Sequence, residues 1–163
     1  MQTFLPYPDF EKTAKCLDWK RLGKQRVEAK QIFDTLVKNP RQDNNSSSIL
    51  WRNHPAVRMW ESHLDVLQEY YKNIVREWVV RGYVNNMPWN LYDASLIGTP
   101  EQPLWMKLEE WDRDPWWLGV EIFHSKHRAT LLAKNFEYYS QFGWSEEPKW
   151  EYWWPTEHID EMC

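Results

Sequence analysis

The chain has 163 residues, of which 42% are hydrophobic, so it is long enough to bury a core and too apolar to be disordered. Its net charge of −4 and its pI of about 5.7 argue against a general affinity for nucleic acid. It has no apolar run long enough to span a membrane, no signal peptide at its start and only two cysteines, Cys16 and Cys163. We therefore expect one cytoplasmic domain over residues 1–163.

The charge is distributed unevenly along the chain. Residues 1–38 contain eight Lys and Arg against five Asp and Glu, whereas residues 101–163 contain six against thirteen. A basic face in the N-terminal third could therefore still meet phosphate groups. The thirteen tryptophans indicate either an unusually aromatic core or a surface that binds flat rings.

The chain begins with an extended segment, because Pro6 and Pro8 push the residues before them out of the helical region. Asp9 is a suitable N-cap for the helix that follows. A longer helix then ends at Asn39–Pro40, and the polar stretch RQDNNSSS after it is typical of a mobile loop. The predicted elements are an extended segment over 1–8, helices over 10–17 and 18–38, and a loop over 41–48.

Two further long helices are predicted in the rest of the chain. The first has Asn53 as its N-cap, Pro55 in its first turn and Gly82 at its end. Its apolar residues recur at helical spacing: Trp60, Leu64, Leu67, Tyr71, Ile74 and Trp78. The second runs over 120–142 and stops at Gly143. The remaining predictions are irregular chain over 83–117 with a short helix over 104–111, and an aromatic surface tail over 144–163.

These elements predict an all-α fold class, with a single compact domain of three main helices joined by long irregular connections. We see no convincing strands, and there are no internal repeats.

The helix predicted over 18–38 has charged residues on both of its faces. A helical projection places four polar side chains within or at the border of its apolar arc: Asp18, Arg21, Gln25 and Glu28. Three lysines point away from that arc: Lys20, Lys24 and Lys30. Because buried charge is costly unless it is paired, the inward set is either a network that fixes helix packing or a site for chemistry. Gly23 leaves room for another group to approach closely.

The helix predicted over 120–142 also has polar residues on an apolar face. His124 and Arg128 lie one turn apart there, with His127 at the margin. They could bind a phosphate or a carboxylate, or could pair with Asp18 or Glu28. His124 and His127 could also be metal ligands. With no cysteine or acidic cluster nearby, we expect neither a metal nor another cofactor.

Other candidate ligand contacts lie outside these helices. His54 immediately precedes a helix start, where backbone N–H groups collect anions. Trp51 and Trp89 lie in irregular segments and could stack on a nucleobase. The sequence contains no phosphate-binding glycine loop, no dinucleotide fingerprint and no nucleophile elbow.

Five stretches of the sequence together resemble the pyrimidine dimer DNA glycosylase family, the family of phage endonuclease V, in its divergent bacterial and phage branch. They are MQTFLPYPDF, LDWKRLGKQRVEA, WRNHPAVRMW, VREWVVRGY and HSKHRATLLAKNFEYYSQFGW. The resemblance covers most of the chain except the loop at 41–48 and the stretch around 85–117. It implies a small all-α domain whose N-terminal segment crosses between its helices.

The resemblance also implies a reaction. In that family the α-amine of the residue after the initiator methionine attacks the sugar C1′, a Schiff base forms, and the strand is cleaved by elimination. Here the second residue is Gln2, and because removal of the initiator generally needs a small second residue, Met1 is expected to stay. The nucleophile would then be the α-amine of Met1, or the protein would have none.

Other roles in the family can be placed on this sequence. The family's glutamate aligns near Leu22–Gly23, so Asp18 or Glu28 would take its place. Arg26 matches a phosphate-binding position. Arg21 and Arg26 would then hold phosphates, and His124 would assist proton transfer.

Three functions follow as alternatives. The first is a DNA glycosylase, with or without lyase activity, that excises a damaged or modified pyrimidine. The second is an enzyme on the same scaffold that acts on a free nucleotide or modified base, which the acidic pI favours. The third is a nucleic-acid-binding protein without chemistry, in which the inward-facing polar residues form only a structural network.

For the first function, DNA or a nucleotide is the expected partner. The predicted catalytic residues are Met1, Asp18, Glu28 and His124. The predicted nucleic-acid contacts are Arg21, Lys24, Gln25, Arg26, Trp51, His54, His127 and Arg128.

Overall fold

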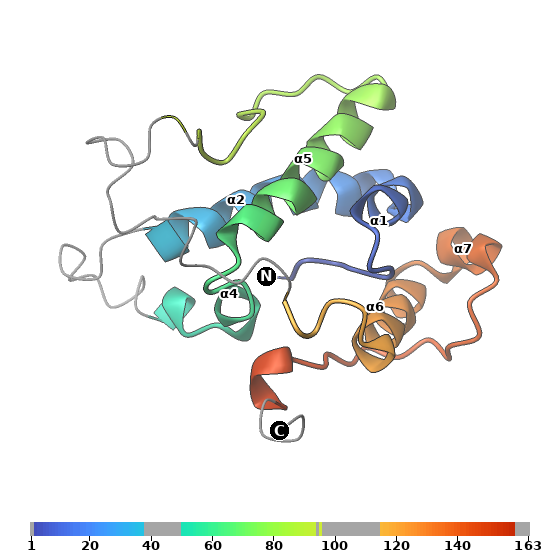
Figure 1. The fold of residues 1–163 in the computed structure, drawn as a ribbon. Coiled ribbons are helices and arrows are strands. Elements are labelled where there is room, and N and C mark those ends of the chain that lie inside the picture. Colours follow the sequence, from blue (N-terminus) through green and yellow to red (C-terminus); the bar gives the residue numbers. More distant parts are fainter. Residues whose placement is uncertain (1, 38–49, 94, 96–114, 159–163) are drawn as a thin grey trace.

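The computed structural model describes residues 2–37, 50–93, 95 and 115–158 (Figure 1). Within these residues the chain is helical and has no strand, so the predicted all-α fold class is confirmed. The three main helices are α2 (Trp19–Val37), α5 (Leu64–Val80) and α6 (Glu121–Lys134). Within the described part of the chain, no helix has the length and apolar character needed to cross a membrane.

The first two helices begin where the sequence predicted. α1 (Phe10–Cys16) is capped by Asp9, whose side chain accepts a hydrogen bond of 2.7 Å from the Lys12 N–H. Asp18 does the same for α2, because its Oδ1 accepts from the Arg21 N–H at 2.8 Å. The predicted end of this helix at residue 38 and the loop over 41–48 lie outside the described residues.

The single helix predicted from Asn53 to Gly82 is wrong, because the structure divides it into α4 (Pro55–Arg58) and α5. His54, and not Asn53, caps α4 by accepting from the Ala56 N–H at 3.1 Å. Ser62 has a φ of 67°, a left-handed conformation that does not continue a helix. The end of α5 before Gly82, whose φ is 89°, is as predicted.

Tertiary contacts stabilise this break. Trp60 lies between α4 and α5, is fully buried and donates from Nε1 to the Thr3 hydroxyl at 3.0 Å. The Met59 carbonyl accepts from Trp117 Nε1 at 3.2 Å. Both partners are distant in the sequence, so the regular spacing of apolar residues gave no sign of the break.

The helix predicted over 120–142 is also divided, into α6, α7 (Phe136–Tyr139) and the 3₁₀ helix η4 (Ser140–Phe142). Asn135 separates them with a φ of −155° and a ψ of 76°. Its side chain accepts from the Tyr138 N–H and donates to Asp18 Oδ2, each at 3.3 Å. Gly143 ends η4 with a φ of 66°, as predicted. The short helix predicted over 104–111 lies outside the described residues.

Residues 2–8 form an extended segment that runs through the middle of the molecule. Figure 1 shows it between α2 and α5 on one side and α6 on the other. Leu5 is fully buried and Phe4 nearly so. The expected crossing of the N-terminal segment between helices is therefore confirmed.

The chain after η4 returns along α6. Lys149 donates its N–H to the Ala129 carbonyl at 3.2 Å, and the Thr130 hydroxyl donates to the Glu151 carbonyl at 2.9 Å. Trp153 and Trp154 pack against the core, and the 3₁₀ helix η5 (Pro155–Glu157) follows them. This course brings Tyr152 toward α2 and the N-terminal segment.

Candidate active site

The backbone of the N-terminal segment is hydrogen-bonded to side chains of α2. The Gln2 N–H donates to Glu28 Oε2 at 3.3 Å, and Gln25 Nε2 donates to the Gln2 carbonyl at 3.0 Å. Gln25 Oε1 accepts from the Phe4 N–H at 2.9 Å and from the Tyr70 hydroxyl at 2.7 Å. One glutamine side chain therefore joins the segment to two helices.

Side chains of α6 hold the next part of the segment. The Leu5 N–H donates to His127 Nδ1 at 2.7 Å, and the Leu5 carbonyl lies 2.8 Å from His124 Nδ1. Because the Gly119 N–H donates to His124 Nε2, the proton of that ring is on Nδ1 and is donated to Leu5. Arg128 Nη1 donates to the Pro6 carbonyl at 2.9 Å.

Both histidines of α6 are buried and neutral. Burial lowers the pKa of His127 to about 3, and the cation of Arg128 acts in the same direction. Burial also lowers the pKa of His124. Both ring nitrogens of His124 have protein partners, and the ring is 1% exposed. The geometry gives His124 a positioning role and leaves no free nitrogen for the predicted proton transfer.

Glu28 is a nearly buried carboxylate on which several donors converge. Its Oε2 accepts from the Gln2 N–H and from Gln25 Nε2, the latter at 3.0 Å. Its Oε1 lies 3.5 Å from Lys24 Nζ. These contacts fix the position of the Glu28 carboxylate beside the N-terminal segment.

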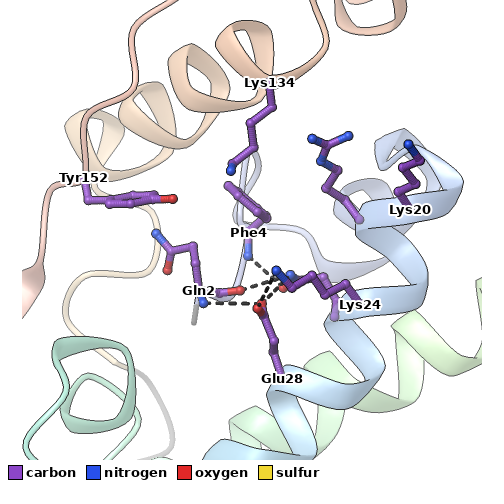
Figure 2. Close-up of a pocket in the computed structure, with 9 residues that line it drawn as sticks. Gln2, Phe4, Lys20, Lys24, Glu28, Lys134 and Tyr152 are labelled. Atoms are coloured by element: carbon purple, nitrogen blue, oxygen red, sulfur yellow. Dashed lines mark hydrogen bonds and ion pairs between the residues drawn. The ribbon is translucent and has the colours of Figure 1, made fainter. Parts of the chain in front are cut away.

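A pocket of about 250 Å³ opens over Glu28 (Figure 2). The described residues that line it are Gln2, Phe4, Lys20, Arg21, Lys24, Gln25, Glu28, Lys134 and Tyr152. Four of these side chains are cationic, and the Glu28 carboxylate lies next to the backbone of Gln2. The volume is near the lower end for small-molecule sites, about 300 Å³, which suits one nucleotide unit. A small basic pocket thus exists in a protein of net negative charge.

Five pocket residues were not among the sequence candidates: Gln2, Phe4, Lys20, Lys134 and Tyr152. Figure 2 shows Lys134 reaching down from α6 toward Phe4, and Tyr152 entering from the irregular C-terminal segment. Lys134 lies two turns after His127 on the same line of α6, so helical periodicity could have indicated it. Tyr152 lies in an irregular segment, where no periodicity could have done so.

The two carboxylates that the sequence left as alternatives have different surroundings. Glu28 lines the pocket, whereas Asp18 caps α2 and contacts Arg21 Nη1 at 2.9 Å and Asn135. Asp18 is 4% exposed and is not among the pocket residues. Arg21 does line the pocket, and Asp18 holds its guanidinium in place.

Arg26 lies on a different side of α2 from the pocket. Its guanidinium stacks 4.1 Å from the centre of the Trp78 ring and donates to Asn85 Oδ1 at 3.0 Å. It is 8% exposed, so little of it is available to a phosphate. The expected close approach at Gly23 is made by the same Trp78 ring, so the space there is filled by the protein itself.

Three further candidates, Trp51, His54 and Arg128, do not line the pocket either. Trp51 and His54 form an aromatic cluster with Trp154, with ring centres 5.7 and 5.9 Å from that of His54. Arg128 is paired with Glu121 and Glu146. Met1 lies outside the described residues. No group of three or more potential metal ligands was found in the described ranges.

The fold and the pocket define an all-α protein with a cationic, carboxylate-containing pocket built on its N-terminal segment. A family model described as pyrimidine dimer DNA glycosylase matches residues 1–91, which is more than half of the chain. The chain therefore belongs to the pyrimidine dimer DNA glycosylase family, as the sequence motifs predicted. The matched region includes Gln2, Gln25 and Glu28, whereas Lys134 and Tyr152 follow it. No curated protein and no solved structure matches the chain.

Proposed function

We propose that the protein is a DNA glycosylase that excises a damaged or modified pyrimidine, and that the reaction takes place in the pocket over Glu28. The observation that supports this most strongly is the position of Glu28. It is a carboxylate within a cationic pocket, next to the backbone of Gln2. Membership of the glycosylase family supports the choice of DNA as substrate.

The pocket residues suit the charges of such a reaction. The cations of Lys20, Arg21 and Lys24 would bind phosphates on either side of the reacting nucleotide. The rings of Phe4 and Tyr152 offer flat surfaces to a base that has left the helical stack. Glu28 would stabilise the positive charge that develops at C1′ as the base departs, and would orient the attacking nucleophile.

The size of the pocket supports binding of a single extrahelical nucleotide. A volume of about 250 Å³ does not admit a duplex, so the target nucleotide would have to turn out of the helix. The same size, together with the net charge of −4, favours a second candidate, an enzyme that acts on a free nucleotide. We prefer the DNA glycosylase because the family assignment supports it.

The test is excision from duplexes that contain a thymine dimer or a modified pyrimidine, by the wild-type protein and by two matched variants. Glu28→Gln keeps the size of the side chain and removes its charge, so excision should fall by at least about 100-fold. Asp34→Asn removes a charge of the same helix outside the pocket, where Asp34 pairs with Lys30, so it should retain the excision rate per folded molecule. Folding is checked by circular dichroism and thermal unfolding.

Equal excision by Glu28→Gln and the wild type would contradict the role of Glu28. If every duplex is left intact while free pyrimidine nucleotides are hydrolysed, the second candidate replaces the first.

A further inference from the structure

Lys134 presents an ammonium group to the pocket. Its Nζ lies 3.5 Å from the centre of the Trp150 ring and 5.9 Å from that of the Phe4 ring. The face of a tryptophan ring attracts a cation, so the contact with Trp150 favours the charged form of Lys134. Among the residues that the structure describes, no oxygen accepts a hydrogen bond from this ammonium group and no carboxylate forms an ion pair with it. Its N–H donors are therefore available to a ligand in the pocket.

The other cations of the pocket already have favourable partners. Lys24 Nζ lies 3.5 Å from Glu28 Oε1, and the Lys24 side chain is 71% exposed to water. Arg21 forms an ion pair at 2.9 Å with a carboxylate outside the pocket. Lys20 is exposed. A negative charge that develops inside the pocket would therefore be stabilised most by Lys134, which is partly buried and has no anionic partner among the described residues.

Lys134 and Glu28 enter the pocket from different helices. Figure 2 shows Lys134 directed into the pocket from α6, above Phe4, and Glu28 extending from α2 toward Gln2. A nucleotide bound between them would have its sugar near the carboxylate, as the proposed function requires. Its base would then lie near the ammonium group.

Excision of a pyrimidine creates charge on both sides of the bond that breaks. When the bond between C1′ and N1 breaks, both of its electrons leave with the base. Positive charge develops on the sugar, and negative charge spreads over N1 and the carbonyl oxygen O2 of the base. A carboxylate stabilises only the first of these charges, so the second needs a cation or a hydrogen-bond donor.

We propose that the ammonium group of Lys134 stabilises the departing pyrimidine, by donating a hydrogen bond to O2 as negative charge develops there and then passing a proton to the base. This inference deepens the proposed function and rests on it. It adds a catalytic residue that lies outside the matched family region.

The step balances with water as the only co-reactant. The oxygen of a water molecule oriented by Glu28 bonds to C1′, and the proton that this water loses passes to the Glu28 carboxylate. The electron pair of the broken bond goes to the base, which gains a proton from Lys134 and leaves as a neutral molecule. Exchange of protons with solvent then restores the carboxylate and the ammonium group.

The acidity of Lys134 suits a proton donor. Burial lowers the pKa of Lys134, and the cations of Arg21 and Lys24 lower it further, whereas Glu28 acts in the opposite direction. A less basic amine passes its proton to a base anion more readily than an ordinary lysine does. The contact with Trp150 favours the ammonium form from which that transfer starts.

The experiment measures single-turnover excision from duplexes with one pyrimidine whose 5-substituent is fluorine, hydrogen or methyl. In this order the anion of the departing base becomes less stable and needs more help to leave. We expect Lys134→Met to slow excision of the 5-methyl base by at least about 100-fold and of the 5-fluoro base by less than about tenfold. Thermal unfolding confirms that each variant is folded.

Two further variants are the controls for this pattern. Lys24→Met removes a cation that would contact phosphate, so it should slow excision of all three bases by the same factor. Lys72→Met removes a lysine of α5 that does not line the pocket, so it should slow none of them.

The pH dependence of excision gives a second readout. The wild-type rate should fall as the pH rises through the lowered pKa of Lys134, because the ammonium group is lost. Lys134→Arg stays charged and still donates hydrogen bonds, so it should retain part of the rate and lack this fall.

Equal slowing of the three bases by Lys134→Met would overturn the inference, because a loss of phosphate binding does not depend on the 5-substituent. An unchanged rate, or the same fall with pH in Lys134→Arg and the wild type, would do so too. In each of these cases the wild type still excises a base, so the proposed function stands. If the wild type removes no base from any duplex, the proposed function fails and the inference fails with it.

Discussion

At the scale of single residues, the packing of the Trp78 ring explains why residue 23 is a glycine. A glycine in the middle of a helix costs about 1 kcal/mol relative to alanine. A Cβ added at this position would lie 2.9 Å from Trp78 Cζ3 and 3.1 Å from Cη2. The ring has little freedom to move, because it stacks on Tyr83 at 4.2 Å and on Arg26 at 4.1 Å, and its Nε1 donates to the Val84 carbonyl. Close packing on Trp78 therefore requires glycine.

Gly23→Ala should lower the stability of the protein, although alanine is the better helix former. We expect a net loss of about 1–2 kcal/mol, because overpacking against a fixed ring outweighs the gain in helix propensity. Urea unfolding of the variant and the wild type measures this loss of stability. In a Trp78→Leu background the same change should become neutral or stabilising. An equal loss in both backgrounds would show that the ring is not the cause.

At the scale of elements, α2 and the N-terminal segment depend on one another. The segment has no strand partner, so side chains must satisfy its backbone groups. Gln25 uses both its amide oxygen and its amide nitrogen for this, with partners in the segment, in α5 and at Glu28. It is fully buried. Arg81 has a similar role at the end of α1, where it donates to the carbonyls of Ala14, Lys15 and Leu17.

Gln25→Leu should destabilise the protein by about 3 kcal/mol, because the Phe4 N–H and the Gln2 carbonyl would remain buried without partners. Chemical unfolding gives the magnitude. The control is Gln31→Leu, at an exposed position of the same helix, which should change stability by less than about 0.5 kcal/mol. Similar losses in the two variants would contradict the role of Gln25.

At the scale of the whole molecule, the acid stability depends on the contact between α6 and the N-terminal segment. His127 is buried, and its pKa is lowered to about 3. Between about pH 3 and pH 6.5 it therefore stays neutral in the folded protein, whereas in the unfolded chain it has an ordinary histidine pKa and becomes protonated. A lowered histidine pKa means that the unfolded state binds more protons below about pH 6.5. Stability is therefore fully present above that pH and is lost as the pH falls toward 3.

The free energy of unfolding should decrease by about 2 kcal/mol between pH 7 and pH 5 on account of His127, with a further loss from His124, whose pKa is also lowered. Urea unfolding across this range measures the slope. His127→Asn has an oxygen that can accept from the Leu5 N–H and cannot be protonated there. It should be less stable at pH 7 but show a flatter slope, and an unchanged slope would exclude His127 as the source.

Local sequence patterns were enough to predict the main helices, several helix ends and the buried polar residues of this protein. Spacing of apolar residues predicted the three main helices, Asp9 and Gly143 marked helix ends, and the projection of α2 correctly buried Asp18, Gln25 and Glu28. These features depend on neighbours within a few residues, which a sequence displays directly. The family motifs lie in the same segments, so family and fold class could be predicted together.

The breaks in two helices and the composition of the pocket were decided only by the tertiary structure. The break before α5 depends on the contact of Trp60 with Thr3, and the break after α6 on that of Asn135 with Asp18. The pocket brings Glu28 together with Lys134 and Tyr152, more than a hundred residues further along the chain. Hydrogen bonds and packing between distant segments have no local signature. For that reason the sequence left Asp18 and Glu28 as equal candidates, and only the structure places Glu28 in the pocket.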